Sequence, residues 1–318
     1  MSNTKVFEEF EEILSKPSVP LGVFVGSGVS SACSSPSGAK PPGWESLVKF
    51  LEGDLGIPES RGMNFPIRLE EVLFDLRDDA TRSAEIVEAI RGLVNGSTDD
   101  LVQPNQVHEA LVDLNPNTII TTNFDDLIER ALLSDRKESQ GYNVWAYSGR
   151  LLRKATQMEE EYPHWRDISL GDLLKSGIPL IAKIHGSLGH DNRDGVSAED
   201  SLAGLVLSES DYRAAYDRSE VSPFLRSIFS THQVLFIGYS LNDDEIRRVL
   251  SDLNTIRSSN VPHIFFQRDE TVVSKKLVEY YRAHYGIAVV TLDDWEKLAR
   301  TLRTMAVIRD GGVGSLLS

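Results

Sequence analysis

The chain has 318 residues, of which 41% are apolar and 25% are charged, a composition typical of a globular protein with a sizeable core. The formal net charge of −15 would repel a phosphate backbone, and no apolar run approaches the length of a membrane span. We therefore expect no direct nucleic-acid binding and no membrane insertion, and the single cysteine, Cys33, excludes a disulfide within the chain and a zinc site built from several cysteines.

Apolar residues at helical spacing predict a first helix over residues 5–15. This acidic start lacks the pattern of a secretory signal, so we expect a cytoplasmic protein. A short apolar strand at 21–25 leads into Gly26-Ser27-Gly28-Val29-Ser30. Small residues and prolines at 31–43 indicate a loop that is mobile or becomes ordered on binding, and 44–115 has a wholly helical pattern.

The middle of the chain contains two more predicted strands. The first, at 118–121, ends at the polar turn Thr122-Asn123-Phe124-Asp125, after which an amphipathic helix begins. Residues 136–178 are polar and irregular, and we expect a helical insertion there. The next apolar strand, at 179–184, ends at His185-Gly186, and a Gly/Asp/Ser-rich exposed loop is expected at 189–201.

The last third of the chain alternates between helices and short apolar strands. Its strands are expected at 234–237, 263–266 and 287–290. Helices are expected at 205–232 and 270–285, and a further helix should begin after Asn242 or Asp243, which would be its N-cap. The last helix should begin at Trp295.

Such alternation predicts an α/β fold with a Rossmann-like doubly wound parallel sheet of about six strands and helices on both faces. We expect one domain over residues 1–310 and a flexible tail at 311–318. The Rossmann-like core is expected at approximately 18–43, 105–135 and 179–310, and helical insertions, forming a small domain without a zinc ribbon, at approximately 44–104 and 136–178.

Small and uncharged polar residues follow successive predicted strands. They are Gly26-Ser27-Gly28, Thr122-Asn123, His185-Gly186, Gly238-Tyr239-Ser240 and Gln267. Since open α/β sheets bind ligands at the carboxyl ends of their strands, we expect these residues to share one crevice. Asp125 is the main carboxylate there. The scarcity of acids suits an anionic ligand and argues against a metal-dependent phosphatase.

Each of these residues also has a simpler explanation when it is taken alone. Asn123 could satisfy the backbone of a turn, Asp125 could cap the following helix, and His185 could be a structural histidine. The glycine pair lacks the third glycine of a dinucleotide fingerprint, because position 31 is serine, which weakens an ordinary dehydrogenase interpretation. Their joint occurrence at successive strand ends favours a binding site.

Four motifs occur in order along the chain, namely Gly26-Ser27-Gly28-Val29-Ser30, Thr122-Asn123-Phe124-Asp125, Lys183-Ile184-His185-Gly186 and Gly238-Tyr239-Ser240-Leu241. As an ordered set they resemble the sirtuin superfamily and, more narrowly, its bacterial sirtuin-like branch. The resemblance extends over roughly residues 20–305 and implies an NAD+ site.

The resemblance implies a role for each motif. Residues implied to hold the phosphates and ribose are Gly26, Ser27, Gly28, Ser30, Gly238 and Ser240. Those implied to line the nicotinamide and ribose pocket are Thr122, Asn123 and Asp125. Asn123 and His185 are the implied catalytic residues: Asn123 would orient the attacking water, and His185 would bind the ribose hydroxyls and exchange protons near neutral pH. Gln267 is also expected to bind the dinucleotide, because it directly follows a predicted strand.

Two departures from deacylating sirtuins bear on the activity. The four zinc-binding cysteines are absent, and no Phe-Gly-Glu segment for pairing with an acylated peptide follows His185. Water is then the expected nucleophile. The resemblance therefore implies a zinc-free NAD+ glycohydrolase, with no cofactor beyond its substrate, of the kind that depletes NAD+ in antiphage defence by abortive infection.

Two other functions remain open. One is a zinc-free deacylase or ADP-ribosyltransferase, and the other is a non-catalytic sensor of NAD+ or ADP-ribose. The resemblance also implies a homo-oligomer and a partner that senses infection, such as an ATPase or an Argonaute-type protein.

Overall fold

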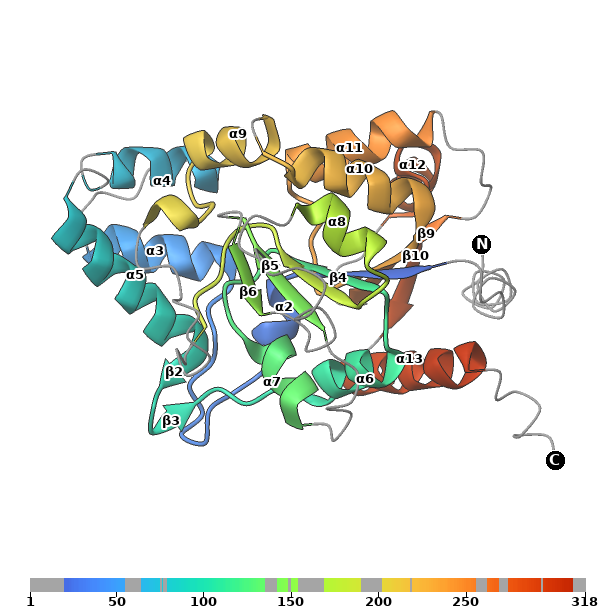
Figure 1. Cartoon of the computed structure of the whole chain (residues 1–318), viewed down its shortest axis with the longest axis horizontal. Helices are drawn as coiled ribbons and strands as arrows, with labels where there is room; N and C mark the ends of the chain where they lie inside the picture. The colour runs from blue at the N-terminus through green and yellow to red at the C-terminus, as the bar shows by residue number, and fades with distance from the viewer. Residues whose placement is uncertain are drawn as a thin grey trace.

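The computed structural model describes residues 20–54, 64–74, 76, 79–134, 142–147, 150–153, 169–189, 202–217, 219–255, 262–268, 274–292 and 294–310. Within them the predicted α/β class is confirmed (Figure 1). The main sheet has eight strands in the order β10-β9-β8-β1-β4-β7-β5-β6, and its neighbours are parallel except for the antiparallel pair β5 and β6. Its strands are β1 (Leu21–Val25), β4 (Thr118–Thr121), β5 (Asn143–Ala146), β6 (Arg150–Arg153), β7 (Leu180–Lys183), β8 (Gln233–Ile237), β9 (His263–Arg268) and β10 (Ile287–Leu292).

Helices cover both faces of the sheet and the carboxyl ends of its strands. They are α2 (Ser27–Ser30), α3 (Trp44–Asp54), α4 (Phe65–Leu73), α5 (Ala80–Asn95), α6 (Gln106–Leu114), α7 (Leu127–Ser134), α8 (Leu170–Lys175), η3 (Leu202–Gly204), α9 (Glu209–Asp217), α10 (Val221–Thr231), α11 (Asp244–Asn254), α12 (Lys275–Tyr285) and α13 (Trp295–Arg309). None of the helices within the described ranges is long and apolar enough to cross a membrane.

Two apolar cores lie on the opposite faces of the sheet. Along β1, Val23 and Val25 point into the core shared with α6 and α13, whereas Phe24 points into the core shared with α10 and α11. The central strands, such as β1, are mostly apolar because both of their faces are buried, as is usual for a parallel sheet. Figure 1 shows α10 and α11 on one side of the sheet and α6 and α13 on the other.

The order in which strands are added to the sheet changes direction at the boundary between β1 and β8. The strands that follow β1 are added on its β4 side, and the last three strands are added on the opposite side, beginning with β8. In a doubly wound sheet this switch point is where the connecting segments diverge and leave a crevice at the carboxyl ends of the strands. The ends of β1 and β8 carry Gly26 and Gly238, respectively.

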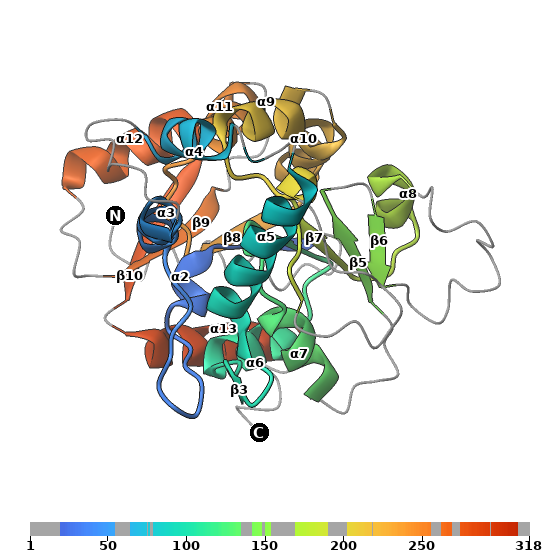
Figure 2. The same cartoon turned by 90° about the vertical axis from the view of Figure 1, so that its left-hand side faces the viewer.

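A separate cluster of helices covers this crevice. Apolar residues of α3, α4 and α5 pack on one another and on residues after β4 and β7, such as Phe124 and Leu188. Figure 2 looks onto α3 and α5 in front of the sheet. The insertion at 44–104 is thus mostly helical, but it is not wholly so, since Gly96–Ser97 (β2) and Asp100–Leu101 (β3) form a small hairpin.

The expected helical insertion at 136–178 is wrong in one respect. Asn143–Ala146 pairs with β7 and Arg150–Arg153 pairs with β5, so this segment extends the main sheet beyond the six expected strands. The strand β5 is only four residues long, and although Val144 and Trp145 favour strands, the stretch around it is polar and irregular, so pairing with β7 decides its conformation. The predicted helix at 5–15, most of the loop at 189–201 and the tail at 311–318 lie outside the described residues.

Candidate active site at the carboxyl edge of the sheet

A cavity of about 1170 Å³ lies at the carboxyl edge of the sheet, which is large enough for a dinucleotide. Residues at the ends of six strands (β1, β4, β7, β8, β9 and β10) line it, together with Trp44 and Leu47 from the helical insertion. The predicted site residues among its lining are Ser27, Gly28, Ser30, Thr122, Asn123, Asp125, His185, Gly238, Ser240 and Gln267. Gly26 does not belong to the lining, so the structure brings ten of the eleven predicted residues to one cavity.

The two glycine motifs touch each other across the switch point. Gly28 N donates a hydrogen bond to Gly238 O (2.8 Å), and Gly26 N donates to Ile237 O (2.9 Å). A Cβ atom on Gly28 would lie 2.8 Å from Gly238 O, and Gly238 itself has a φ of +62°. The close approach of β1 and β8 therefore requires glycine at both positions. Because these two N–H groups are used within the protein, phosphate binding by the loop would need other donors, such as the hydroxyl groups of Ser27 and Ser240.

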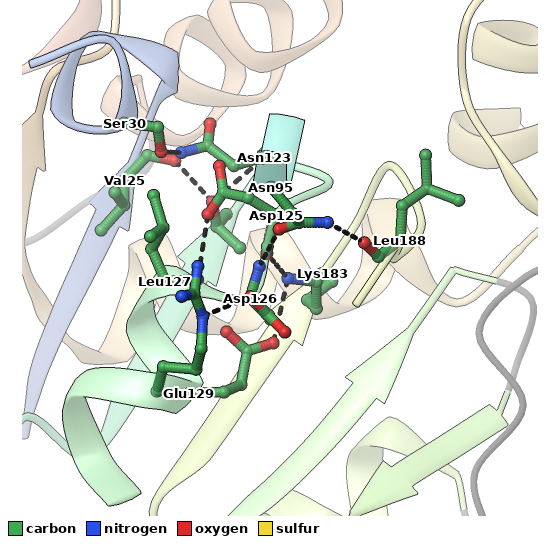
Figure 3. A network of polar contacts seen from close by, with 12 residues as sticks. Val25, Ser30, Asn95, Asn123, Asp125, Asp126, Leu127, Glu129, Lys183 and Leu188 are labelled. Carbon is green, nitrogen blue, oxygen red and sulfur yellow. Dashed lines mark hydrogen bonds and ion pairs between the residues drawn. The ribbon is translucent and has the colours of Figure 1, made fainter. Parts of the chain in front are cut away.

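We call the residues Ser30, Asn123, Asp125, Glu129 and Lys183 the turn network, since they hold the turn between β4 and α7 (Figure 3). Asn123 Nδ2 donates to Gly26 O (3.2 Å) and to Ser30 Oγ (2.8 Å). The Gly26 carbonyl can only accept, so the amide nitrogen must face it. Asn123 Oδ1 is thereby left without a hydrogen-bond partner among the described residues.

Charged groups also hold this turn in place. Lys183 is fully buried, donates to the Asp125 backbone carbonyl and lies 3.0 Å from Glu129 Oε1. Burial raises the pKa of the Asp125 carboxyl, while the Lys183 charge and the Ser30 hydroxyl oppose this rise. Asp125 Oδ1 also accepts from Leu127 N (3.2 Å), so Asp125 bonds to the first turn of α7 and lines the cavity as well.

One residue of the helical insertion is tied to the turn network. Asn95, at the end of α5, is fully buried, and its Nδ2 donates to Leu188 O (2.5 Å). Its Oδ1 accepts from Asp126 N (3.4 Å). Figure 3 shows Asn95 between the loop after β7 and the turn after β4, so the insertion is hydrogen-bonded to the segments that follow both strands.

A second group, which we call the imidazole cluster, consists of His185, Tyr212, Tyr216 and Asp243. His185 Nε2 lies 3.0 Å from Tyr216 Oη, and Tyr216 Oη donates to Asp243 Oδ2 at 3.4 Å. The Tyr212 ring contacts the imidazole edge-on, with centroids 5.0 Å apart. Burial lowers the pKa of His185 to about 3, so the imidazole is neutral at pH 7, whereas a titration near neutral pH was expected.

Sequence interpretation missed three residues of this site. Tyr216 lies on α9, far along the chain from His185, and nothing local to it indicates the contact. Asp243 was considered only as a helix N-cap, a role that its Oδ1 does fill. Lys183 carried a detectable signal, because a charged residue interrupts the otherwise apolar strand β7. No group of three or more His, Cys, Asp or Glu side chains suited to a metal ion occurs in the described part of the chain.

Comparisons with known proteins agree with this arrangement. A family model described as a SIR2-like domain matches residues 117–290, more than half of the chain. The chain is 24% identical over 296 residues to Defense-associated sirtuin 2 of Bacillus subtilis, which covers 91% of this chain and 25% of the relative. It is 23% identical over 242 residues to NAD(+) hydrolase ThsA of Enterococcus faecium, and this match covers 68% of this chain and 44% of the relative. The chain therefore spans a quarter to under half of the length of these curated relatives.

Proposed function

Because the chain belongs to the SIR2-like family, we propose that it is an NAD+ glycohydrolase that releases nicotinamide and ADP-ribose. The observation that carries this proposal is the state of Asn123. Its amide is held by Gly26 and Ser30 while its Oδ1 has no partner among the described residues, at the wall of a cavity large enough for a dinucleotide. A buried amide oxygen in this state is suited to accept a hydrogen bond from a ligand or from an attacking water.

The proposed reaction needs little acid catalysis. A water oxygen bonds to C1′ of the nicotinamide ribose, the C1′–N bond breaks, and its electron pair stays on nicotinamide, which leaves as a neutral molecule. The water loses one proton, which passes to the solvent, so the products are nicotinamide, ADP-ribose and a proton. Asn123 Oδ1 would orient this water, and the neutral His185 would accept a hydrogen bond from a ribose hydroxyl. Asp125, whose carboxyl is held by Ser30, would contact the nicotinamide side.

The hydroxyl groups of Ser27 and Ser240 would bind the phosphates, and Gln267 would contact the adenosine half, because these residues line the cavity on the β1, β8 and β9 side of Asn123. Trp44 and Leu47 of the helical insertion line the same cavity and would exclude bulk water from the reacting bond. No resident metal or other cofactor is part of this proposal.

A role in defence follows as part of the same proposal. One relative is named as a defence-associated sirtuin and the other as an NAD(+) hydrolase. We infer that this chain acts in the cytoplasm as the NAD+-depleting effector of an antiphage system, assembles as a homo-oligomer, and is released from inhibition by a sensor such as an ATPase or an Argonaute-type protein.

The test is to incubate the protein with NAD+ and to separate the products by chromatography, and also to measure NAD+ in cells that express it. We expect nicotinamide and ADP-ribose in equal amounts. Asn123→Ala and His185→Ala should each lower the rate by at least about 100-fold, since Asn123 would orient the attacking water and His185 would contact the reacting ribose. His284→Ala, on the exposed side of α12, is the matched control and should leave the rate unchanged.

Three outcomes would contradict the proposal. Full activity in both variants would remove the assigned roles. Transfer of ADP-ribose to an acyl peptide or to a protein would indicate a transferase. Measurable NAD+ affinity without NAD+ loss, either in the purified protein or in cells, would indicate a sensor.

A further inference from the structure

The imidazole cluster contains a hydrogen-bonded chain that sets where the His185 proton sits. His185 follows β7, Tyr216 lies on α9 and Asp243 precedes α11, so three separate elements meet. The His185 Nε2 to Tyr216 Oη distance is 3.0 Å and the Tyr216 Oη to Asp243 Oδ2 distance is 3.4 Å. The side chains of His185 and Asp243 are 5% and 7% exposed, so water does not readily replace these contacts.

The two oxygens of Asp243 have different partners. Oδ1 accepts from Glu245 N (3.0 Å) and Ile246 N (3.3 Å) and caps α11. Oδ2 faces Tyr216, and it also lies 3.8 Å from His185 Nε2. An ionised carboxylate can only accept, so Tyr216 must donate its one hydrogen to Oδ2.

The tautomer of His185 follows from this direction. Once the Tyr216 hydrogen points to Asp243, the phenol oxygen can serve His185 only as an acceptor, so Nε2 must carry the imidazole hydrogen. The lone pair is then on Nδ1. While the Tyr216 hydrogen points to Asp243, an Nδ1–H tautomer would place the lone pairs of Nε2 and Tyr216 Oη against each other at 3.0 Å.

The surroundings keep the phenol in place and protonated. The Tyr212 and Tyr216 rings stack with centroids 6.0 Å apart and planes inclined by 15°. Burial raises the pKa of both tyrosines well above 10. Burial also raises the pKa of Asp243, to about 6, which still leaves the carboxyl ionised at pH 7 and above. The other titratable groups near Asp243 are Tyr239, which shares the desolvated pocket, and Glu245, on its own helix.

We propose that Tyr216 and Asp243 are positioning residues that hold His185 in the Nε2–H tautomer and so direct the Nδ1 lone pair to a ligand. The hydrogen-bond chain stands on the structure alone, and its catalytic consequence rests on the proposed NAD+ hydrolysis. This role differs from helix capping, because it uses the second oxygen of Asp243.

The decisive measurement is the ¹⁵N NMR spectrum of the full chain labelled at histidine, with the His185 signals identified by their loss in His185→Ala. The wild-type protein at pH 7.5 should show a protonated Nε2 and an unprotonated Nδ1. In Asp243→Asn the side-chain oxygen can still cap α11, but the amide then points to Tyr216 as a donor. Tyr216 must turn its hydrogen to Nε2, and the tautomer should change to Nδ1–H.

Two further variants complete the test. Tyr216→Phe keeps the ring but removes the hydroxyl, and it should give a mixture of tautomers. Asp252→Asn, at an exposed position further along α11, is the matched control and should give the wild-type spectrum. The NAD+ hydrolysis rate should fall by about 10²–10⁴-fold in Asp243→Asn, with KM changed by less than about threefold, since the imidazole stays in place and only its Nδ1 lone pair is replaced by an N–H.

The outcomes separate the two proposals. An Nδ1–H tautomer in the wild-type protein, or the same tautomer in all variants, would overturn the positioning role even if NAD+ is hydrolysed. The expected change of tautomer in a protein that does not hydrolyse NAD+ would support the positioning role and contradict the proposed function. Should Asp243→Asn fail to fold, the wild-type and Tyr216→Phe spectra still decide the question.

Discussion

The turn network and the imidazole cluster lie on neighbouring strand ends, and both bury a carboxyl group, but they balance its charge in different ways. In the turn network, burial raises the pKa of Asp125 and Glu129, and the Lys183 ammonium opposes the rise in each. In the imidazole cluster, Asp243 has no lysine or arginine within ion-pair distance among the described residues, and burial raises its pKa to about 6.

This difference indicates that the two groups of residues have different roles at the carboxyl edge of the sheet. Opposite charges that are largely buried, such as Lys183 and Glu129, hold a backbone in one geometry, because separating them would leave a charge unpaired. Groups that are neutral, or whose pKa lies near the ambient pH, can instead change their protonation or hydrogen-bond direction when a ligand binds. We therefore expect the buried ion pair of the turn network to determine the stability of the site, and Asn123 together with the imidazole cluster to determine its chemistry.

The largest expected effect is from Lys183→Met. This change leaves the buried Glu129 carboxyl unpaired and removes the donor to the Asp125 carbonyl, so the free energy of unfolding should fall by about 3–5 kcal/mol. Urea unfolding followed by circular dichroism measures it. The matched control is Lys175→Met, which breaks an exposed ion pair with Asp172 and should produce no measurable change. Equal effects of the two substitutions would show that the buried ion pair stabilises the protein no more than the exposed one.

A second, smaller effect should appear in the pH dependence of stability. The folded-state pKa of Asp243 is raised from 3.8 to about 6, so the folded protein binds the proton more tightly than the unfolded chain. The associated stability is fully present below pH 3.8 and is lost as the pH rises through 6, by roughly 3 kcal/mol. Wild type should therefore lose stability relative to Asp243→Asn between pH 4 and pH 6.

This measurement must be a difference between the two proteins. Burial lowers the pKa of His185, which acts in the opposite direction over the same pH range, and Tyr212, Tyr216 and Glu245 also face or adjoin the carboxyl. These groups are present in both proteins, so their contributions largely cancel. A pH-independent difference would show that Asp243 has no raised pKa.

The smallest expected effect is from Ser30→Ala. The Ser30 hydroxyl accepts from Asn123 and interacts with the Asp125 carboxyl, and its removal should lower the free energy of unfolding by about 1–2 kcal/mol. Ser31→Ala is the matched control, because the Ser31 hydroxyl is half-exposed and bonds only to Gly28 O nearby, so it should cost less than about 0.5 kcal/mol. A cost at Ser30 no larger than at Ser31 would remove Ser30 from the turn network.

Local sequence patterns determined most of the fold and which residues meet at the site. Six strands of the sheet, including β1, β4 and β8, are apolar runs that end at glycine or polar residues, and each occurs where it was expected. Because parallel strands place their carboxyl ends at one edge, the order of the motifs was enough to predict that Asn123 and His185 line one cavity.

Only the tertiary structure decided the remaining features, because they depend on contacts between distant segments. The strand β5 is extended since it pairs with β7, and its own polar surroundings do not predict it. Lys183 is tolerated inside a strand only because α7 brings Glu129 to it. The chain from His185 through Tyr216 to Asp243 likewise exists because α9 and the start of α11 pack against the end of β7, so the direction of the imidazole proton is a property of the packed molecule and not of any motif.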